Sequence, residues 1–429
     1  MSARTTVVVL TKDGGDHLER GLAALFAARP TRGGAEVLLV DNASSDGAPE
    51  RATRRFPGLR LLRSERNLGF AGGVMLGASS SSSELLVLVN DDAVVEEDAL
   101  ASLVEALDEA GSDVIAAAGV LTDPGGDRVD FVDGLVTFDG HALQRWVGQR
   151  LAEIALPPRG EPRLFPCGGL CAVRRRPFEA LWGFDTDFFA YLEDVDFGWR
   201  AALAGFGTVF VPEARARHLS GATGQRLGLA MRGVLFEANA LAVVVKNLGD
   251  DALAALLPAI LFTREHRTMW GLLERQEGAR EALGDAFSPL RLPVRLASEL
   301  QASPPTSRRQ RVTSGLARLT GAVEAGPPPR VHGPGQPLLL SDEYARMWLV
   351  ASHRILAHWP RLWDKRRRVQ GLRRVSDDEL LGRWPLHLVP TYPGDEELFA
   401  SPSFAGLLPQ SPQLVRTTLA EIAAVGGGV

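Results

Sequence analysis

Cysteine, surplus positive charge and long apolar runs are all scarce in this chain of 429 residues. It has two cysteines, Cys167 and Cys171, without a second pair or a histidine cluster nearby. This favours buried thiols in a reducing compartment over a zinc site or a disulfide framework. The formal net charge of −5 leaves no excess of cations to displace counterions, so nucleic acid is not expected as the main partner.

The apolar runs argue against a membrane-spanning protein. The most apolar stretch of the second half, residues 235–262, contains Glu237, Lys246, Asp250 and Asp251, and nothing reaches the roughly 18 apolar residues of a span. Residues 1–4 lead directly into a strand-like segment, without the apolar core and cleavage site of a signal peptide. We expect a cytoplasmic protein, and peripheral contact with the inner face of the plasma membrane stays open.

The first half of the chain alternates expected strands with expected helices. Apolar, β-branched runs predict strands over residues 6–10, 37–40, 59–62 and 85–89. After the first strand, Asp16 can cap a helix that carries Leu18, Leu22, Leu25 and Phe26 on one side. This order predicts a mostly parallel sheet with right-handed crossovers, in which ligands bind beyond the carboxyl ends of the strands.

The length exceeds one ordinary hydrophobic core, so we expect roughly two or three domains. Beyond residue 221 the pattern becomes that of Ala- and Leu-rich helices, and Pro/Gly clusters at 303–305 and 326–335 mark extended connections. The expected parts are an α/β domain over 1–225, a helical extension over 226–302, a Pro/Gly-rich linker region over 303–340 and a basic, aromatic helical region over 341–429.

Carboxylates follow two of the expected strands at the edge where ligands bind. Asp41 comes directly after residues 37–40, and the pair Asp91 and Asp92 follows Asn90 beyond the fourth strand. Adjacent carboxylates at the end of a buried strand suit a divalent cation, although acids in a solvated loop ahead of a helix over 94–107 would look the same. Asp41 can bind a nucleotide base or sugar, or satisfy the backbone of its own turn.

A glycine-rich segment, residues 67–73, leads into an expected helix that runs to Ala78. Glycines let backbone amides approach a ligand closely, and a helix N-terminus favours phosphate. The spacing is neither that of a dinucleotide-binding fingerprint nor that of a Walker loop. A purely structural glycine turn therefore stays an alternative.

A second acidic cluster, Glu193, Asp194 and Asp196, opens an expected helix over residues 194–204. The helix dipole alone favours acids in a first turn, but it does not explain the aromatic residues around them. Those aromatics would form a pocket suited to sugar rings and would raise the pKa of a carboxylate, as a general base requires. They are Phe188, Phe189, Tyr191, Phe197 and Trp199.

Several segments of the first half, each weak alone, are specific in their order and spacing: residues 40–47, 67–73, 89–93, 183–200, 211–214 and 218–220. Together they resemble the GT-A-fold family 2 glycosyltransferases, especially the branch with bacterial rhamnosyl- and galactofuranosyltransferases. The resemblance implies an α/β fold, a Rossmann-like GT-A nucleotide-diphosphate-sugar transferase domain with a mostly α-helical C-terminal extension. One departure is Val74-Met75, where the family usually places an Asn that contacts the donor.

The resemblance also implies roles on the donor side. Asp41 would bind the nucleobase of a nucleotide-diphosphate sugar, and Asp91 would lie near its ribose. Asp92 would ligate Mg2+ or Mn2+ on the diphosphate, and His218 would complete the metal site, although a lone His near a strand end is often only a surface or core residue. Further donor contacts are implied at Thr11, Asn67 and Gly72.

On the acceptor side, the resemblance makes Asp194 the base that deprotonates the acceptor hydroxyl, with Glu193 as the alternative. Trp182 and Trp199 are candidates for acceptor contact, with core packing as the other interpretation. One base that faces one leaving group implies direct displacement and hence inversion at the anomeric carbon.

The implied activity is that of a metal-dependent inverting glycosyltransferase in cell-envelope or polysaccharide biosynthesis. By resemblance, the donor is dTDP-rhamnose or UDP-galactofuranose, and the acceptor is a saccharide or a polyprenyl-diphosphate-linked saccharide. Two other functions stay open, a sugar nucleotidyltransferase and a degenerate transferase that serves as a carbohydrate-binding scaffold.

Residues 344–375 interleave tryptophans with arginines and lysines. A basic helix with tryptophans is typical of an element that docks on anionic lipid headgroups. The alternative is a charged face that packs on the catalytic domain through its aromatics. The tail from residue 386 onward carries no pattern that we can interpret.

Overall fold

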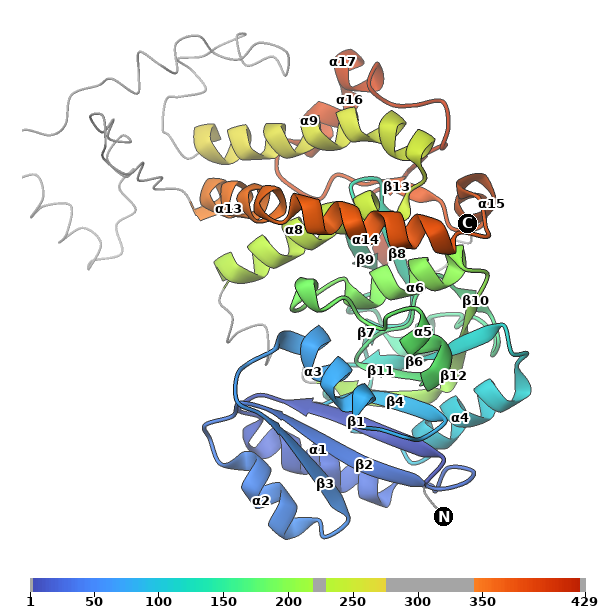
Figure 1. Ribbon diagram of the computed structural model, residues 1–429. Coiled ribbons are helices and arrows are strands. Elements are labelled where there is room, and N and C mark those ends of the chain that lie inside the picture. Colours follow the sequence, from blue (N-terminus) through green and yellow to red (C-terminus); the bar gives the residue numbers. More distant parts are fainter. Residues whose placement is uncertain (1–2, 219–228, 275–342, 425–429) are drawn as a thin grey trace, which may run out of the picture. The chain divides into compact units, whose positions relative to one another are not determined.

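The computed structural model describes residues 3–218, 229–274 and 343–424 (Figure 1). The expected linker region over 303–340 lies outside these residues. The chain divides into two compact units. The first comprises Met1–Ala254, Ile355–Val389 and Gln410–Val429, and the second comprises Ala255–Arg354 and Pro390–Pro409.

Four parallel strands form one part of the main sheet, and they confirm the four expected strands. They are β1 (Thr5–Thr11), β2 (Ala35–Asn42), β3 (Leu59–Ser64) and β4 (Leu85–Asn90), in the spatial order β3-β2-β1-β4. Each neighbouring pair is parallel. Their carboxyl ends therefore meet at one edge of the sheet, where Thr11, Asp41 and Asp91 lie.

Beyond β4 the sheet becomes mixed. β11 (Leu170–Arg174) is antiparallel to β4 and to β6 (Val114–Thr122), while β12 (Gly207–His218) is parallel to β6. Short strands complete the sheet: β5 (Ala93–Val95), β7 (Val129–Phe131) and β10 (Pro162–Arg163).

Helices cover this sheet because their apolar sides need a partner. α3 (Gly69–Ser79), α5 (Arg175–Ala180) and α6 (Glu193–Leu203) share a buried core with alternate residues of the sheet, such as Val8, Leu38 and Leu86. The other connecting elements are α1 (Gly15–Ala27), α2 (Ala48–Arg55), α4 (Ala99–Glu109) and the 3-10 turns η1 (Leu151–Glu153) and η2 (Thr186–Phe188).

Two local predictions about α1 are wrong. Asp16 does not cap the helix, because α1 begins at Gly15 and its N-cap is Gly14. A Cβ at Gly14 would come within 2.5 Å of the Thr11 hydroxyl, so the close packing at this turn requires a glycine. Phe26 lies outside the buried side, with 42% of its surface exposed, and stacks on Phe56 instead.

The expected helix over 94–107 is also partly wrong. Residues Ala93–Val95 form β5, which pairs antiparallel with β12 and opposes Ala93 to His218. Only afterwards does α4 begin, at Ala99. Strand pairing overrides the local helical pattern here, and it brings His218 next to the acidic pair at 91–92.

The first unit also contains further helices and a second sheet, to which the C-terminal part of the chain contributes. These helices are α8 (Leu229–Asn247), α14 (Trp359–Leu372), α15 (Asp377–Arg383) and α18 (Leu419–Ala423). The second sheet has the order β14-β13-β8-β9, with β8 (Gly134–Thr137), β9 (Ala142–Gln144), β13 (Leu386–Leu388) and β14 (Val415–Arg416). The tail, in which the sequence showed no pattern, thus supplies two strands.

The second unit is held by its own buried ion pair. Arg267 Nη2 lies 2.8 Å from an Asp395 carboxylate oxygen, and Trp348 is buried against Tyr392. Its helices include most of α9 (Asp250–Glu274) and α13 (Glu343–Ala357), with α16 (Asp395–Ala400) and α17 (Pro402–Ala405). In the described part of the chain, every helix is too short or too polar to cross a membrane.

Candidate active site

The ends of β1 and β4 place a hydroxyl against a carboxylate. Thr11 Oγ1 donates a hydrogen bond of 2.6 Å to Asp91 Oδ2, and both side chains are buried. A Cβ at Gly14 would lie 2.9 Å from the same carboxylate oxygen. Since glycine leaves this space open, the turn after β1 packs directly over the pair.

Asp41 lies beside Thr11 at the end of β2. Its Oδ1 accepts a hydrogen bond of 2.8 Å from the backbone amide of Ser44, which is the turn-forming role weighed above. Its Oδ2 lies 3.7 Å from Arg63 Nε. One carboxylate oxygen therefore shapes the turn, and the other faces a cation.

Asn42 is a further residue of the candidate site, which the sequence pattern did not indicate. Its Nδ2 donates to Asn67 Oδ1 at 2.9 Å and to Gly69 O at 3.1 Å, while its Oδ1 accepts from Leu68 N at 2.7 Å. The side chain therefore fixes the conformation of the glycine-rich segment. Its position next to Asp41 was the available signal.

The glycines of residues 67–73 are needed for close packing, whether or not a ligand binds there. A Cβ at Gly73 would lie 2.2 Å from Leu10, and one at Gly72 would lie 2.8 Å from Leu68. The backbone amide of Ala71 in the first turn of α3 already donates to Phe189 O at 3.1 Å. The helix N-terminus therefore has fewer open amides for a phosphate than the sequence pattern suggested.

The departure at Val74-Met75 has a packing explanation. Val74 is 2% exposed within the core beneath α3, and Met75 Sδ accepts a hydrogen bond of 3.3 Å from Phe184 N. Both side chains thus support the segment that leads to α6.

His218 joins three polar residues at the end of β12. Its Nε2 lies 3.0 Å from Asp92 Oδ1 and 3.0 Å from Asn90 Nδ2. Its Nδ1 lies 2.7 Å from an oxygen of Asp130, a residue of β7 that the sequence pattern did not indicate. The two carboxylates raise the pKa of His218 to about 9 although burial acts in the opposite direction.

This arrangement fits a divalent cation held with the help of a substrate. Within the described residues, no group of three or more His, Cys, Asp or Glu side chains is placed to hold a metal. Asp92 and His218 offer an oxygen and a nitrogen side by side, and Mg2+ commonly takes one or two carboxylates together with substrate phosphates. Asp130 also contacts Nδ1, the ring nitrogen of His218 that faces away from Asp92. Histidines that bind a metal commonly donate their other ring N–H to a carboxylate in this way.

Glu193 and Asp194 open α6 but differ in their surroundings. Asp194 is half-buried, and its Oδ2 accepts a hydrogen bond of 3.0 Å from Gly168 N. Glu193 is 5% exposed, and among the described residues its Oε2 has no hydrogen-bond partner. Burial raises the pKa of both carboxyls, as the sequence predicted, although the cause is general burial and not an aromatic wall.

Asp196 is a structural acid. Its carboxylate lies 2.9 Å from Arg200 Nε and 2.9 Å from Lys246 Nζ, and all three groups are buried. A carboxylate held between two cations is a poor proton acceptor.

The predicted aromatic wall is largely wrong. Phe188, Phe197 and Trp199 are 2%, 0% and 0% exposed. Phe197 packs edge-on against Phe178 and Phe184 in the core, because α6 turns that side toward the sheet. Phe189 and Tyr191 stay half-buried.

The two tryptophans considered for acceptor contact differ in their exposure to solvent. Trp199 is wholly buried, which removes it as an acceptor contact, whereas Trp182 is 43% exposed.

One turn links the two acidic clusters. Gly168 N bonds Asp194, Gly169 O accepts from Asn90 N at 3.2 Å, and the Asn90 side chain contacts His218. Burial and the nearby carboxylates of Asp194 and Asp130 raise the pKa of Cys167 in this turn. The turn at residues 167–169 thus contacts Asp194 and Asn90 directly, and the Asn90 side chain leads on to His218.

The basic, tryptophan-rich region has an inner and an outer side. On α14, Leu362, Arg366 and Val369 are buried, as the packing alternative requires. Trp359 and Trp363 stack on each other, with Trp363 38% exposed. Arg361, Arg367 and Arg368 are exposed.

The fold and this site define an α/β enzyme of the Rossmann-like GT-A type. A sequence model described as glycosyl transferase family 2 matches residues 6–182. Two curated relatives, from the CDC 1551/Oshkosh and H37Rv strains of Mycobacterium tuberculosis, are named N-acetylglucosaminyl-diphospho-decaprenol L-rhamnosyltransferase. Each is 34% identical over 236 residues, which cover 49% of this chain and 75% of the relative. The chain therefore belongs to glycosyl transferase family 2 and is a glycosyltransferase.

Solved structures of other glycosyltransferases are more distantly similar. GalNAc-T7 with UDP, GalNAc and Mn2+ gives a TM-score of 0.48 at 20% identity, covering 61% of this chain and 51% of that one. The mannosyltransferase PcManGT from Pyrobaculum calidifontis, in complex with GDP-Man and Mn2+, gives 0.42 at 19% identity, covering 85% and 88%.

Proposed function

We propose that this chain is a metal-dependent inverting glycosyltransferase that moves rhamnose from a nucleotide-diphosphate donor to a lipid-diphosphate-linked saccharide in cell-envelope polysaccharide synthesis. The relatives named as rhamnosyltransferases of N-acetylglucosaminyl-diphospho-decaprenol support this acceptor class and this sugar. We take dTDP-rhamnose as the donor and UDP-galactofuranose as the alternative.

On the donor side, we propose that Asp41 and the Thr11–Asp91 pair bind the nucleoside. These groups end neighbouring parallel strands, so a nucleotide at this edge of the sheet meets them together. Asn67 and Gly72 would contribute as part of the glycine-rich segment, whose shape Asn42 fixes.

We propose that Asp92 and His218 hold the divalent cation, Mg2+ or Mn2+. Once bound, the cation would neutralise the departing diphosphate. Asp130 keeps the His218 ring oriented so that Nε2 faces Asp92.

We propose that Asp194 is the general base. Its carboxylate takes the proton of the acceptor hydroxyl as that oxygen bonds to the anomeric carbon and the bond from this carbon to the diphosphate oxygen breaks. Glu193 is the weaker candidate because it is more deeply buried. The observation that carries the proposal is the turn at residues 167–169, which contacts Asp194 on one side and Asn90, the neighbour of His218, on the other.

The test compares Asp194→Asn with Glu193→Gln. We expect Asp194→Asn to abolish transfer while calorimetry shows dTDP-rhamnose binding nearly unchanged, and we expect Glu193→Gln to retain transfer. Loss of donor binding together with activity would show that Asp194 is not the base. Manganese-dependent release of dTDP or UDP from a panel of nucleotide sugars would exclude a nucleotidyltransferase and a catalytically inactive scaffold.

We also propose peripheral contact with an anionic membrane through the outer side of α14. Exposed arginines beside stacked, partly exposed tryptophans suit lipid headgroups, and such a contact would bring the enzyme to a lipid-linked acceptor.

A further inference from the structure

The segment of residues 182–192, which leads into α6, has a strained backbone. Four residues that are not glycine adopt positive φ angles here: Trp182 at 65°, Phe189 at 64°, Tyr191 at 73° and Leu192 at 66°. Such conformations persist only where surrounding contacts hold them, and they cluster at functional sites. Leu192 is the N-cap of α6, so the path of this segment decides where Asp194 lies.

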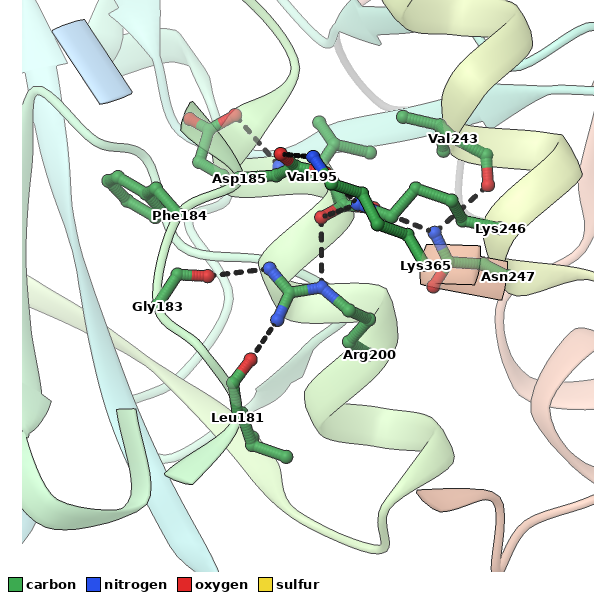
Figure 2. Close-up of polar contacts among 12 residues, drawn as sticks. Leu181, Gly183, Phe184, Asp185, Val195, Arg200, Val243, Lys246, Asn247 and Lys365 are labelled. Carbon is green, nitrogen blue, oxygen red and sulfur yellow. Dashed lines mark hydrogen bonds and ion pairs between the residues drawn. The ribbon is translucent and has the colours of Figure 1, made fainter. Parts of the chain in front are cut away.

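Two lysines from the C-terminal part of the first unit hold this segment through one carboxylate (Figure 2). Lys246 Nζ, on α8, lies 2.6 Å from Asp185 Oδ2, and Lys365 Nζ, on α14, bonds Asp185 Oδ1. Lys246 also reaches Asp196 inside α6. The same lysine therefore ties the segment to the helix that carries Asp194.

A second carboxylate extends the cluster. Lys365 Nζ lies 2.5 Å from Asp187 Oδ2, and Arg361 Nη2 lies 2.7 Å from Asp187 Oδ1. Asp185 is 8% exposed at its side chain, and the two lysines hold the pKa of its carboxyl well below the usual range against the effect of burial. The segment thus stays anionic and attached to α8 and α14.

Backbone contacts hold the segment on two further sides. Asn239 Nδ2, on α8, donates to the carbonyls of Phe188, Ala190 and Tyr191 at 2.8–3.0 Å. From the donor side, Ala71 N in α3 bonds Phe189 O. The segment therefore connects the glycine-rich segment of the donor site to the proposed base.

We propose that Lys365 and Lys246 are positioning residues for sugar transfer, through which α14 and α8 fix the Asp194 carboxylate opposite the donor. This inference rests on the proposed role of Asp194 as the base. It makes the C-terminal helices part of the working active site and not only an extension that follows it.

The attachment of α14 does not depend on Lys365. Arg366 Nη1 donates to Val245 O and Leu248 O at 2.6 and 2.5 Å, and Gln370 Nε2 donates to Lys246 O and Leu248 O. Figure 1 shows α14 alongside α8. Removal of the Lys365 charge should therefore leave the helix in place and free the segment that it holds.

The experiment compares Lys365→Met, Lys365→Arg and a matched control, Arg367→Met, in the full chain. Arg367 lies on the same helix but is 69% exposed at its side chain, and its ion pair among the described residues is with Asp364 of the same helix. Initial rates are measured with dTDP-rhamnose and a water-soluble, short-chain GlcNAc-diphosphate acceptor, so that the membrane contact proposed for Arg367 does not affect the rate. We expect Lys365→Met to lower kcat about tenfold or more while the donor KM stays within about twofold, because misplacing a catalytic group slows the chemistry more than it weakens binding.

Two further readouts separate positioning from general stability. Lys365→Arg should restore most of kcat, and hydrogen exchange of residues 183–192 should be faster in Lys365→Met than in the control. Asp187→Asn removes the charge that pairs with Lys365 and Arg361, at a partly exposed position, and should also lower kcat. This variant replaces Lys365→Met in the test if Lys365→Met does not fold.

The outcomes distinguish this inference from the proposed function. If Lys365→Met keeps kcat within about twofold of wild type, or loses no more than Arg367→Met, the positioning role is overturned while the transferase activity stands. If the wild-type protein transfers no sugar from either donor, the proposed function is overturned, and the positioning role falls with it.

Discussion

Nδ1 of His218 lies 2.7 Å from a carboxylate oxygen of Asp130, on a strand well separated from it in sequence. Asp130 and Asp92 together raise the pKa of His218 to about 9 against the effect of burial, so at neutral pH both ring nitrogens carry a proton. A cation bound at Nε2 would displace the proton there, and Asp130 would keep the other proton on Nδ1.

The first prediction concerns this carboxylate. Asp130→Asn should weaken Mn2+ binding in the presence of dTDP by about 10- to 100-fold, because outer partners orient the ligating ring. Calorimetric titration with Mn2+ measures the affinity directly. Asp127→Asn, a change at an exposed acid nearby, should leave it unaltered. Equal affinity in both variants would exclude Asp130 from the metal site.

The second prediction is the pH dependence of transfer. Because burial raises the pKa of Asp194, the carboxylate gains its proton at a higher pH than an ordinary Asp, and a protonated acid cannot act as base. The acid limb of kcat/KM should therefore lie above about pH 4. A pH–rate profile checks this. A limb at the ordinary carboxyl value would contradict the assignment.

The same burial predicts a gain in stability on substitution. In the folded state Asp194 binds its proton more tightly than in the unfolded chain, so its ionisation at neutral pH destabilises the fold. Asp194→Asn should consequently raise the melting temperature at pH 7 while it abolishes transfer. A melting temperature equal to or below that of wild type would show that burial is not what raises the pKa.

The next prediction uses a buried histidine away from the site. His141 lies 3.1 Å from Glu237 and 3.2 Å from Asp139, and their charges outweigh burial and raise its pKa from 6.5 to about 9. The folded state binds the extra proton between these values, so the stabilisation is complete below about pH 6.5 and is lost as pH rises to about 9.

His141 contributes an expected loss of about 3 kcal/mol in the free energy of unfolding over this window. His218, whose pKa is also raised to about 9, adds a loss of its own. Urea unfolding at pH 6 and pH 9.5 measures it. His141→Gln should remove the share of this loss that His141 contributes and leave that of His218. His358→Gln, a change at an exposed histidine of the same unit, should remove none of it. A wild-type stability that is constant across the window would refute the prediction.

The last prediction addresses the outer side of α14. Replacement of Arg367 and Arg368 by Ser should reduce co-sedimentation with anionic liposomes several-fold, since each cation near a charged surface contributes about 1 kcal/mol. Arg366 is left unchanged because its guanidinium is buried and bonds backbone carbonyls. Unchanged binding of the double variant would remove the membrane proposal.

The pattern of the sequence was sufficient for the parallel part of the sheet and for the carboxylates that lie at the ends of its strands. Four apolar runs gave β1 to β4, because a strand buried on both faces must be apolar along its length. The sequence pattern wrongly placed Phe197 and Trp199 in the wall of a pocket, because helical spacing alone does not say which side of α6 packs against the sheet. It also missed Asn42 and Asp130, single polar residues whose importance depends on what lies next to them.

By itself, then, the sequence determined the strand–helix alternation, the carboxylates at strand ends and the family to which the chain belongs, because these depend on short-range patterns and spacing. Only the tertiary structure decided that β5 and β12 bring His218 to Asp92, that Lys365 reaches Asp185, and that one side of α14 is buried and the other exposed. Contacts between residues far apart in the chain are set by how strands pair and helices pack, and no local pattern encodes them.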